Sequence, residues 1–187
     1  MNRLLCHLLR FRRAQEGIAY LEFAIALPLI IGMLLGAVEV TRYILIAQKV
    51  EKVSVTVSDI VAQQSTIGTT QLNQLITAAG QVMKPYSFDS NAYVIISSVY
   101  KSGTAPPVVK WQYTGGGSWI KSSQVGFTGS TATLPQGFSM VDKENVIIAE
   151  VFYNYQPIFG SNVLHGSQLY KYAIFKPRLG DLTSLGS

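Results

Sequence analysis

Residues 12–43 read RRAQEGIAYLEFAIALPLIIGMLLGAVEVTRY, and this stretch decides how the chain is organised. From Ile18 to Val38 the only side chain that is charged at neutral pH belongs to Glu22. Wound as a helix, this run rises about 31 Å, which matches a hydrocarbon core of about 30 Å. Pro28 is tolerated in such a helix as a kink. The sequence therefore predicts one transmembrane helix close to the N-terminus.

The apolar run is too long for the core of a secretory signal, and no break follows it. The chain continues as VEVTRYILIAQKVEKVSVTVSDIVAQQ over residues 38–64, which we expect to extend the helix as an amphipathic segment. The β-branched run at residues 53–57 would also suit a strand. The residues expected to form the apolar face of the extension are Ile44, Ala47, Val50 (or Glu51), Ile60 and Val61.

Positive charge is concentrated before the apolar run. Four arginines and one glutamate give residues 1–17 a net charge of +3, which leaves +2 of the total of +5 for residues 18–187. Arg10, Arg12 and Arg13 therefore predict a cytoplasmic N-terminus and an outer C-terminal domain by the positive-inside rule. A charge placed in this way argues against nucleic acid as a partner. Cys6 is the only cysteine, so the chain forms no internal disulfide.

Gly17 lies at the border between the basic leader and the apolar run. Glycine lacks Cβ and resists helix formation, so it suits a protease that needs an extended substrate with space around the scissile carbonyl. A cut after Gly17 would free the amino group of Ile18. Glu22 would then lie one helical turn from that positive charge, at the positive end of the helix dipole. An acid inside a membrane segment is a functional hypothesis in its own right.

The N-terminal pattern consists of the arginine pair, Gly17, the Glu22-Phe23 pair, the proline within the run, and the acid and arginine at its outer end. This pattern resembles the TadE/TadF minor pseudopilins of the Tad/Flp pilus system. The resemblance covers about residues 12–64, including VSDIVAQQ, and does not separate TadE from TadF. It implies that a prepilin peptidase cuts between Gly17 and Ile18 and that Glu22 and Phe23 serve recognition or assembly.

The resemblance further implies a mature protein in the bacterial inner membrane that helps to build an adhesive pilus. Its partners would be the prepilin peptidase, other pilins or pseudopilins, the inner-membrane platform and membrane lipid. Two alternatives stay open: a single-span anchor for a periplasmic enzyme or receptor domain, and a pseudopilin of a secretion system. Secretion pseudopilins usually have another residue pattern beside the acid, so Phe23 favours the Tad class.

Residues 65–187 are expected to form a periplasmic α+β domain, after a leader over 1–17 and a helix over 18–64. QLNQLITAAGQVM predicts a short helix capped by Thr69 or Thr70 and ended before Lys84-Pro85. Alternation then predicts an antiparallel sheet of about four strands packed on one or two helices. A Gly-, Ser- and Thr-rich stretch between the second and third strands is expected to be a surface excursion or partly mobile. The strand segments are NAYVIISSVY, VVKWQYT, NVIIAEVFYNY and LYKYAIFK.

No catalytic or cofactor motif stands out, and we expect no enzyme activity, cofactor or metal. His165 is the only histidine after the leader and is interpreted as a loop residue. Asp89, or Asp142 with Glu144, matches no calcium loop. Residues 115–117 are three glycines without the lysine of a phosphate loop. Three aromatic side chains that could form a binding surface are interpreted as packing residues: Trp111, Tyr113 and Trp119.

Overall fold

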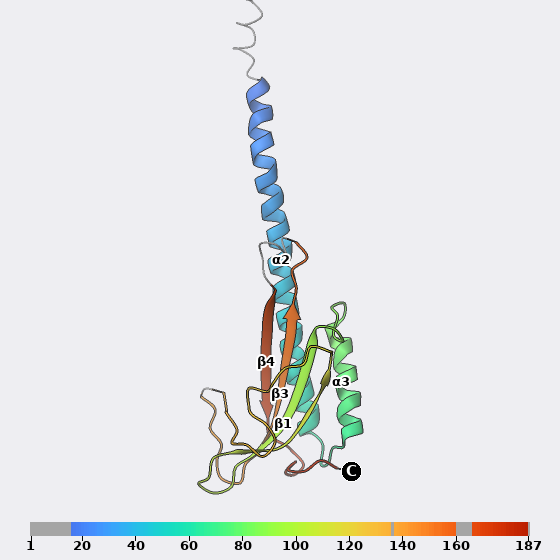
Figure 1. Cartoon of the computed structure of the whole chain (residues 1–187), viewed down its shortest axis with the longest axis vertical. Helices are drawn as coiled ribbons and strands as arrows, with labels where there is room; N and C mark the ends of the chain where they lie inside the picture. The colour runs from blue at the N-terminus through green and yellow to red at the C-terminus, as the bar shows by residue number, and fades with distance from the viewer. Residues whose placement is uncertain (1–15, 136, 160–165, 187) are drawn as a thin grey trace, which may run out of the picture. The chain divides into compact units, whose positions relative to one another are not determined.

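The computed structural model describes residues 16–135, 137–159 and 166–186. It divides into two compact units, Met1–Arg42 and Tyr43–Ser187. The fold class is α+β, as expected, with a long N-terminal helix followed by a small domain with a four-stranded sheet (Figure 1). The elements are α2 (Glu16–Ala62), α3 (Thr69–Met83), β1 (Ala92–Tyr100), β2 (Val108–Gly116), β3 (Asn145–Tyr155) and β4 (Ser167–Phe175).

The sheet is antiparallel throughout, in the order β2-β1-β3-β4. β1 and β2 form the expected hairpin around the loop that contains Gly103, and its register shifts by one residue between Ser98 and Val99. β1 pairs with β3 from Ala92↔Tyr153 to Tyr100↔Asn145. The four strand segments that alternation predicted are therefore all confirmed.

The main core lies between one face of the sheet and two helices, α3 and the part of α2 from residue 43 onward. β3 points alternate residues into this core, as the sequence predicted: Ile147, Ala149, Val151, Tyr153 and Tyr155. α2 contributes a stripe at helical spacing: Ile46, Val50, Val53, Val57 and Val61.

The other face of the sheet is covered as well. Val125, Ala132 and Met140 from the connection between β2 and β3 are buried against strand residues such as Val99 and Ile148. Because both faces are covered, nearly every residue of β1 and β3 is buried. The connection was expected to be a surface excursion, and the structure adds that its few apolar residues complete a second core.

One local expectation needs correction, because the buried stripe of α2 includes Ile46 rather than Ile44, which is 48% exposed, and Ile60 also lies outside it. The run at residues 53–57 continues the expected helix, because Val53 and Val57 both face the sheet and burial overrides their strand preference. α2 ends at Ala62, close to the expected end at about Gln64.

The N-cap of α3 is Gly68, not a threonine. The side chain of Gln71 accepts a hydrogen bond of 2.7 Å from the Gly68 N–H, and Leu72 N donates to Gly68 O at 3.1 Å. A glutamine three residues into the helix therefore does the capping, which is the reaching-back half of a capping box. The end of α3 at Met83 is as expected.

Candidate functional site

The residues that the sequence singled out for processing and assembly all lie at the start of α2. Gly17 and Ile18 belong to its first turns, and Glu22 follows Ile18 by one turn on the same side of the helix. The side chains of Ile18 and Phe23 are 60% and 61% exposed, and Glu22 is exposed as well. Arg10, Arg12 and Arg13 lie outside the described residues.

Most large apolar side chains along α2 between residues 18 and 40 face outward. Among the described residues, α2 is the one helix that is long and apolar enough to cross a membrane. An apolar surface of this extent is unfavourable in water and favourable in lipid. The helix therefore fits a single membrane anchor. Its most exposed large apolar residues in this range are Tyr20, Met33, Leu29, Leu21 and Leu34.

A charged pair marks the end of the apolar run. Arg42 Nη1 lies 3.2 Å from Glu39 Oε1, one turn away on the same helix. The hydroxyl of Thr41 donates to the carbonyl O of Ala37 at 2.8 Å, so this polar group is satisfied within the helix. The sequence pattern noted the acid and the arginine but did not predict that they pair.

The one acid buried in the sheet is Glu150, at the centre of β3, among the residues that the structure describes. Its carboxylate accepts hydrogen bonds from the Ser123 hydroxyl, from Gln124 N at 2.8 Å and from the Tyr170 hydroxyl at 3.0 Å. Burial raises the pKa of Tyr170 far above its ordinary value, and the charge of Glu150 raises it further. Glu150 therefore anchors the β2–β3 connection to the sheet. Sequence reasoning missed it, because one acid in an apolar strand carries no motif.

Asp142 and Glu144 each have protein partners. Asp142 Oδ1 accepts from the Gly103 N–H, and Glu144 pairs with Lys176 and accepts from Val141 N at 2.6 Å. Burial raises the pKa of Glu144, but the hydrogen bonds from Lys176 and Val141 and the charge of Lys101 outweigh it and hold the pKa below its ordinary value. Across the described ranges, no group of three His, Cys, Asp or Glu could hold a metal.

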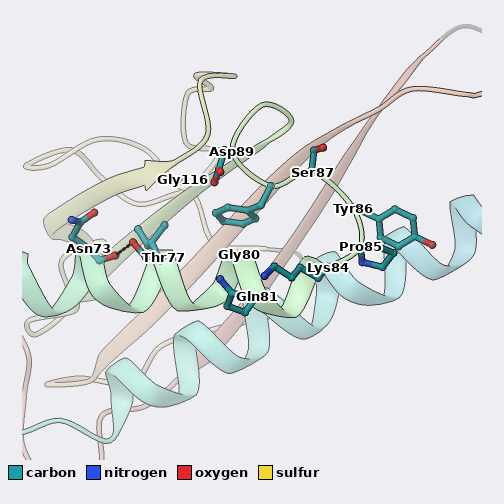
Figure 2. Close-up of a pocket in the computed structure, with 12 residues that line it drawn as sticks. Asn73, Thr77, Gly80, Gln81, Lys84, Pro85, Tyr86, Ser87, Asp89 and Gly116 are labelled. Atoms are coloured by element: carbon teal, nitrogen blue, oxygen red, sulfur yellow. Dashed lines mark hydrogen bonds between the residues drawn. The ribbon is translucent and has the colours of Figure 1, made fainter.

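A cavity of about 410 Å³ lies between α3 and the segment that follows it (Figure 2). Its polar lining includes Asn73, Gln81, Lys84 and Asp89. Within α3, the Thr77 hydroxyl donates a 2.9 Å hydrogen bond to Asn73 O. The residues that line it include one lysine and one aspartate but neither histidine nor cysteine. This lining supplies hydrogen-bonding groups without a paired nucleophile and base.

Two of the three aromatic residues considered as a binding surface pack inside the domain. Trp111 is buried and Tyr113 packs against the main core. Trp119 is partly exposed, with Lys121 Nζ 4.0 Å from its ring centroid. His165 lies outside the described residues, so its interpretation as a loop residue stays a prediction.

Comparison with known proteins bears on the helix. Residues 17–55 match the model of a family described as TadE-like protein. No curated protein and no solved structure matches the chain. The matched segment contains Gly17, Glu22, Phe23, Pro28 and the Glu39–Arg42 pair, whereas most of the sheet domain lies outside it. Over residues 17–55, this chain is therefore similar to the TadE-like family.

Proposed function

We propose that this chain is a membrane-anchored minor pseudopilin that is needed for assembly of an adhesive Tad/Flp-type pilus. The observation that carries the proposal is the TadE-like match over residues 17–55, on a helix whose apolar side chains face outward. The match supports a role connected with the Tad pilus. The specific role and the processing step belong to the proposal.

A prepilin peptidase would remove residues 1–17 and leave Ile18 as the new N-terminus. The mature chain would sit in the bacterial inner membrane with a periplasmic domain, held in that orientation by Arg10, Arg12 and Arg13. Its partners would be other pilins or pseudopilins and the inner-membrane pilus platform, with lipid around the helix. The proposal needs no catalytic residue in this chain.

N-terminal sequencing of the protein recovered from native membranes tests the processing step. We expect a chain that starts at Ile18 and lacks Cys6. Gly17→Val should retain the leader, because a branched side chain crowds the scissile carbonyl and stiffens the backbone. Gly32→Val is the matched control: it lies in the same helix, far from the cut, and a Cβ there meets no atom within 4 Å.

Function is tested by complementing a strain that lacks this gene. The wild-type chain should restore pili and Gly17→Val should not, whereas Gly32→Val should be cut normally. An intact mass that retains residues 1–17 in pilus-forming cells would refute the processing step. Normal pili in the deletion strain would refute the assembly role.

A further inference from the structure

The cavity beside α3 is bordered by polar side chains. Five of them line it and are exposed: Asn73, Gln81, Lys84, Ser87 and Asp89. Across residues 16–135, 137–159 and 166–186, none of these five side chains makes a hydrogen bond or an ion pair with protein. The cavity measures about 410 Å³, within the usual range of about 300–1,000 Å³ for ligand sites. Its polar lining is therefore free to bind a ligand.

The lining comes largely from two neighbouring segments (Figure 2). Asn73, Thr77 and Gln81 are spaced four residues apart on α3 and so follow one side of the helix. The segment after α3 turns back beside the helix and supplies the other wall. It is joined to the last turn of α3 by a 2.9 Å hydrogen bond, which Tyr86 N donates to Met83 O. The two walls are thus held next to each other.

The floor of the cavity is apolar. The side chains of Ile76 and Phe88 line it and are 2% and 6% exposed. A Cβ on Gly80 would lie 3.3 Å from the Phe88 ring, and a Cβ on Gly116 would lie 3.4 Å from it. Glycine is unfavourable inside a helix, so the room that it leaves for this ring explains Gly80. The site combines this apolar floor with polar walls.

The lining has no net charge. Lys84 and Asp89 are its charged members, with one charge of each sign. An anion would meet the carboxylate of Asp89, and a metal ion, which prefers several oxygen ligands, would find a single carboxylate beside a lysine. An apolar ligand would bury the polar walls without replacing their hydrogen bonds to water. A neutral ligand that carries both hydroxyl and amide groups fits this lining best.

We propose that this cavity binds a neutral oligosaccharide of N-acetylated hexosamines. Asn73 and Gln81 each carry a carboxamide, which donates and accepts hydrogen bonds and so complements the acetamido group of such a sugar. The acetamido methyl group would rest on the apolar floor. Ser87, Lys84 and Asp89 supply the donors and acceptors that ring hydroxyls need. The proposal goes beyond the role in pilus assembly and does not depend on it.

Saturation-transfer magnetic resonance tests the proposal on the full chain, in a detergent without a sugar headgroup. The probe is the linear trimer of β-linked N-acetylglucosamine. The control ligand is cellotriose, which has the same linkage but carries a hydroxyl in place of each acetamido group. We expect the strongest transfer from the protein at the acetamido methyl protons. The affinity for the acetylated trimer should be several-fold higher than the affinity for cellotriose.

Two variants locate the sugar. Asn73→Ala and Gln81→Ala should each weaken binding about 2- to 10-fold, which is what one hydrogen bond contributes. Both side chains are exposed, so the fold should be retained, and circular dichroism verifies this. Gln74→Ala is the matched control and should bind like the wild type, because Gln74 is an exposed amide on the same helix that does not line the cavity.

Failure of the wild-type chain to show transfer to the acetylated trimer would overturn the proposal, as would equal affinity for cellotriose. Equal binding by all three variants would place the sugar elsewhere and would also overturn it. A steep fall in affinity with added salt would assign the cavity to an ionic ligand instead. Two results support the proposal and identify the source of the sugar. Cosedimentation with purified cell-wall glycan, competed by the trimer, would indicate a polymer, whereas binding of the trimer alone would indicate a free oligosaccharide.

Discussion

The indole Nε1 of Trp111 lies 2.7 Å from the carbonyl O of Leu182 and donates a hydrogen bond to it, which joins the centre of β2 to the C-terminal tail. Ser98 donates to the same oxygen at 2.6 Å, and Leu182 N donates to Asn145 Oδ1 at 2.8 Å. The side chain of Leu182 is buried in the main core. The tail thus closes the core and is held there by three buried hydrogen bonds.

Replacing Trp111 with phenylalanine should lower the free energy of unfolding by about 1–2 kcal/mol, because it removes the indole donor and part of the ring while Ser98 still satisfies the carbonyl. Denaturant unfolding of the full chain in detergent, followed by far-ultraviolet circular dichroism, measures the change. Trp119→Phe is the control, and its partly exposed ring should cost less than about 0.5 kcal/mol. Equal losses in the two variants would contradict a special role for the tail contact.

Gly117 lies where two backbone segments come close. A Cβ on this residue would be 2.5 Å from the carbonyl O of Ala92 and nearer still to that of Asp89. We expect Gly117→Ala to destabilise the domain by about 1–3 kcal/mol, because backbone atoms must shift. At Gly115 the nearest atom would be Cδ1 of Ile76, at 3.0 Å, which is the flexible end of a side chain. Gly115→Ala should therefore cost clearly less in the same unfolding assay, and the reverse order would refute this explanation.

The strands were predictable because their alternation is local, whereas the long-range contacts were not. The sequence indicated that Ile147 and Val151 share a face, but nothing near Glu150 indicated that Ser123 and Tyr170 would meet it. The same limit explains the choice between Ile44 and Ile46, because both lie in an apolar stretch and only the position of the sheet decides which one is buried. At the N-terminus the motif is entirely local, so the match at residues 17–55 was expected from the sequence.

Glu144 makes the folding stability fall at low pH. Its pKa is held below the ordinary value of 4.5, so the unfolded chain takes up this proton first as pH falls. The stabilisation is present above about pH 4.5 and is lost as the pH falls through the lowered value. Glu144→Gln should cost about 1 kcal/mol at neutral pH, since its partner Lys176 is largely exposed, and should flatten the loss of stability in acid. Unfolding free energies from pH 3 to 7 test this, and an unchanged acid slope would contradict it.

Tyr170 makes the folding stability fall at high pH, whereas Glu144 makes it fall at low pH. Its pKa is raised above the ordinary value of 10.0, so the stabilisation it contributes is present below pH 10 and is lost as pH rises, when the unfolded phenol ionises first. Tyr170→Phe should leave the number of phenols that titrate in the folded protein unchanged, as measured by absorbance at 295 nm. The same substitution should lower by one the number of phenols that titrate in the denatured protein. Loss of one titrating phenol from the folded Tyr170→Phe variant would contradict the contact between Tyr170 and Glu150.

The last prediction separates assembly from processing and concerns Glu22. After a cut at Gly17, its carboxylate would lie one helical turn from the Ile18 amino group, or would pair with the terminus of a neighbouring subunit and fix the axial register of the helices. Removing one partner of a buried ion pair costs about 3–5 kcal/mol, and less near an interface. Alanine is a good helix former, so Glu22→Ala should be made and inserted normally. We expect it to be cut more completely than Gly17→Val and yet to fail to restore pili in a deletion strain.

Glu22→Asp should restore pili only partly, because its shorter side chain reaches less far toward the amine. Glu51→Ala provides the matched control on the same helix: Glu51 pairs with Lys171 at 3.1 Å, but both side chains are exposed, so the loss should be small and pili should form. Pili are counted by electron microscopy, and co-purification with partner pilins is measured from the same membranes. Normal pili and normal co-purification in the Glu22→Ala strain would show that this acid has no role in assembly, because the variant removes the one carboxylate within the apolar run.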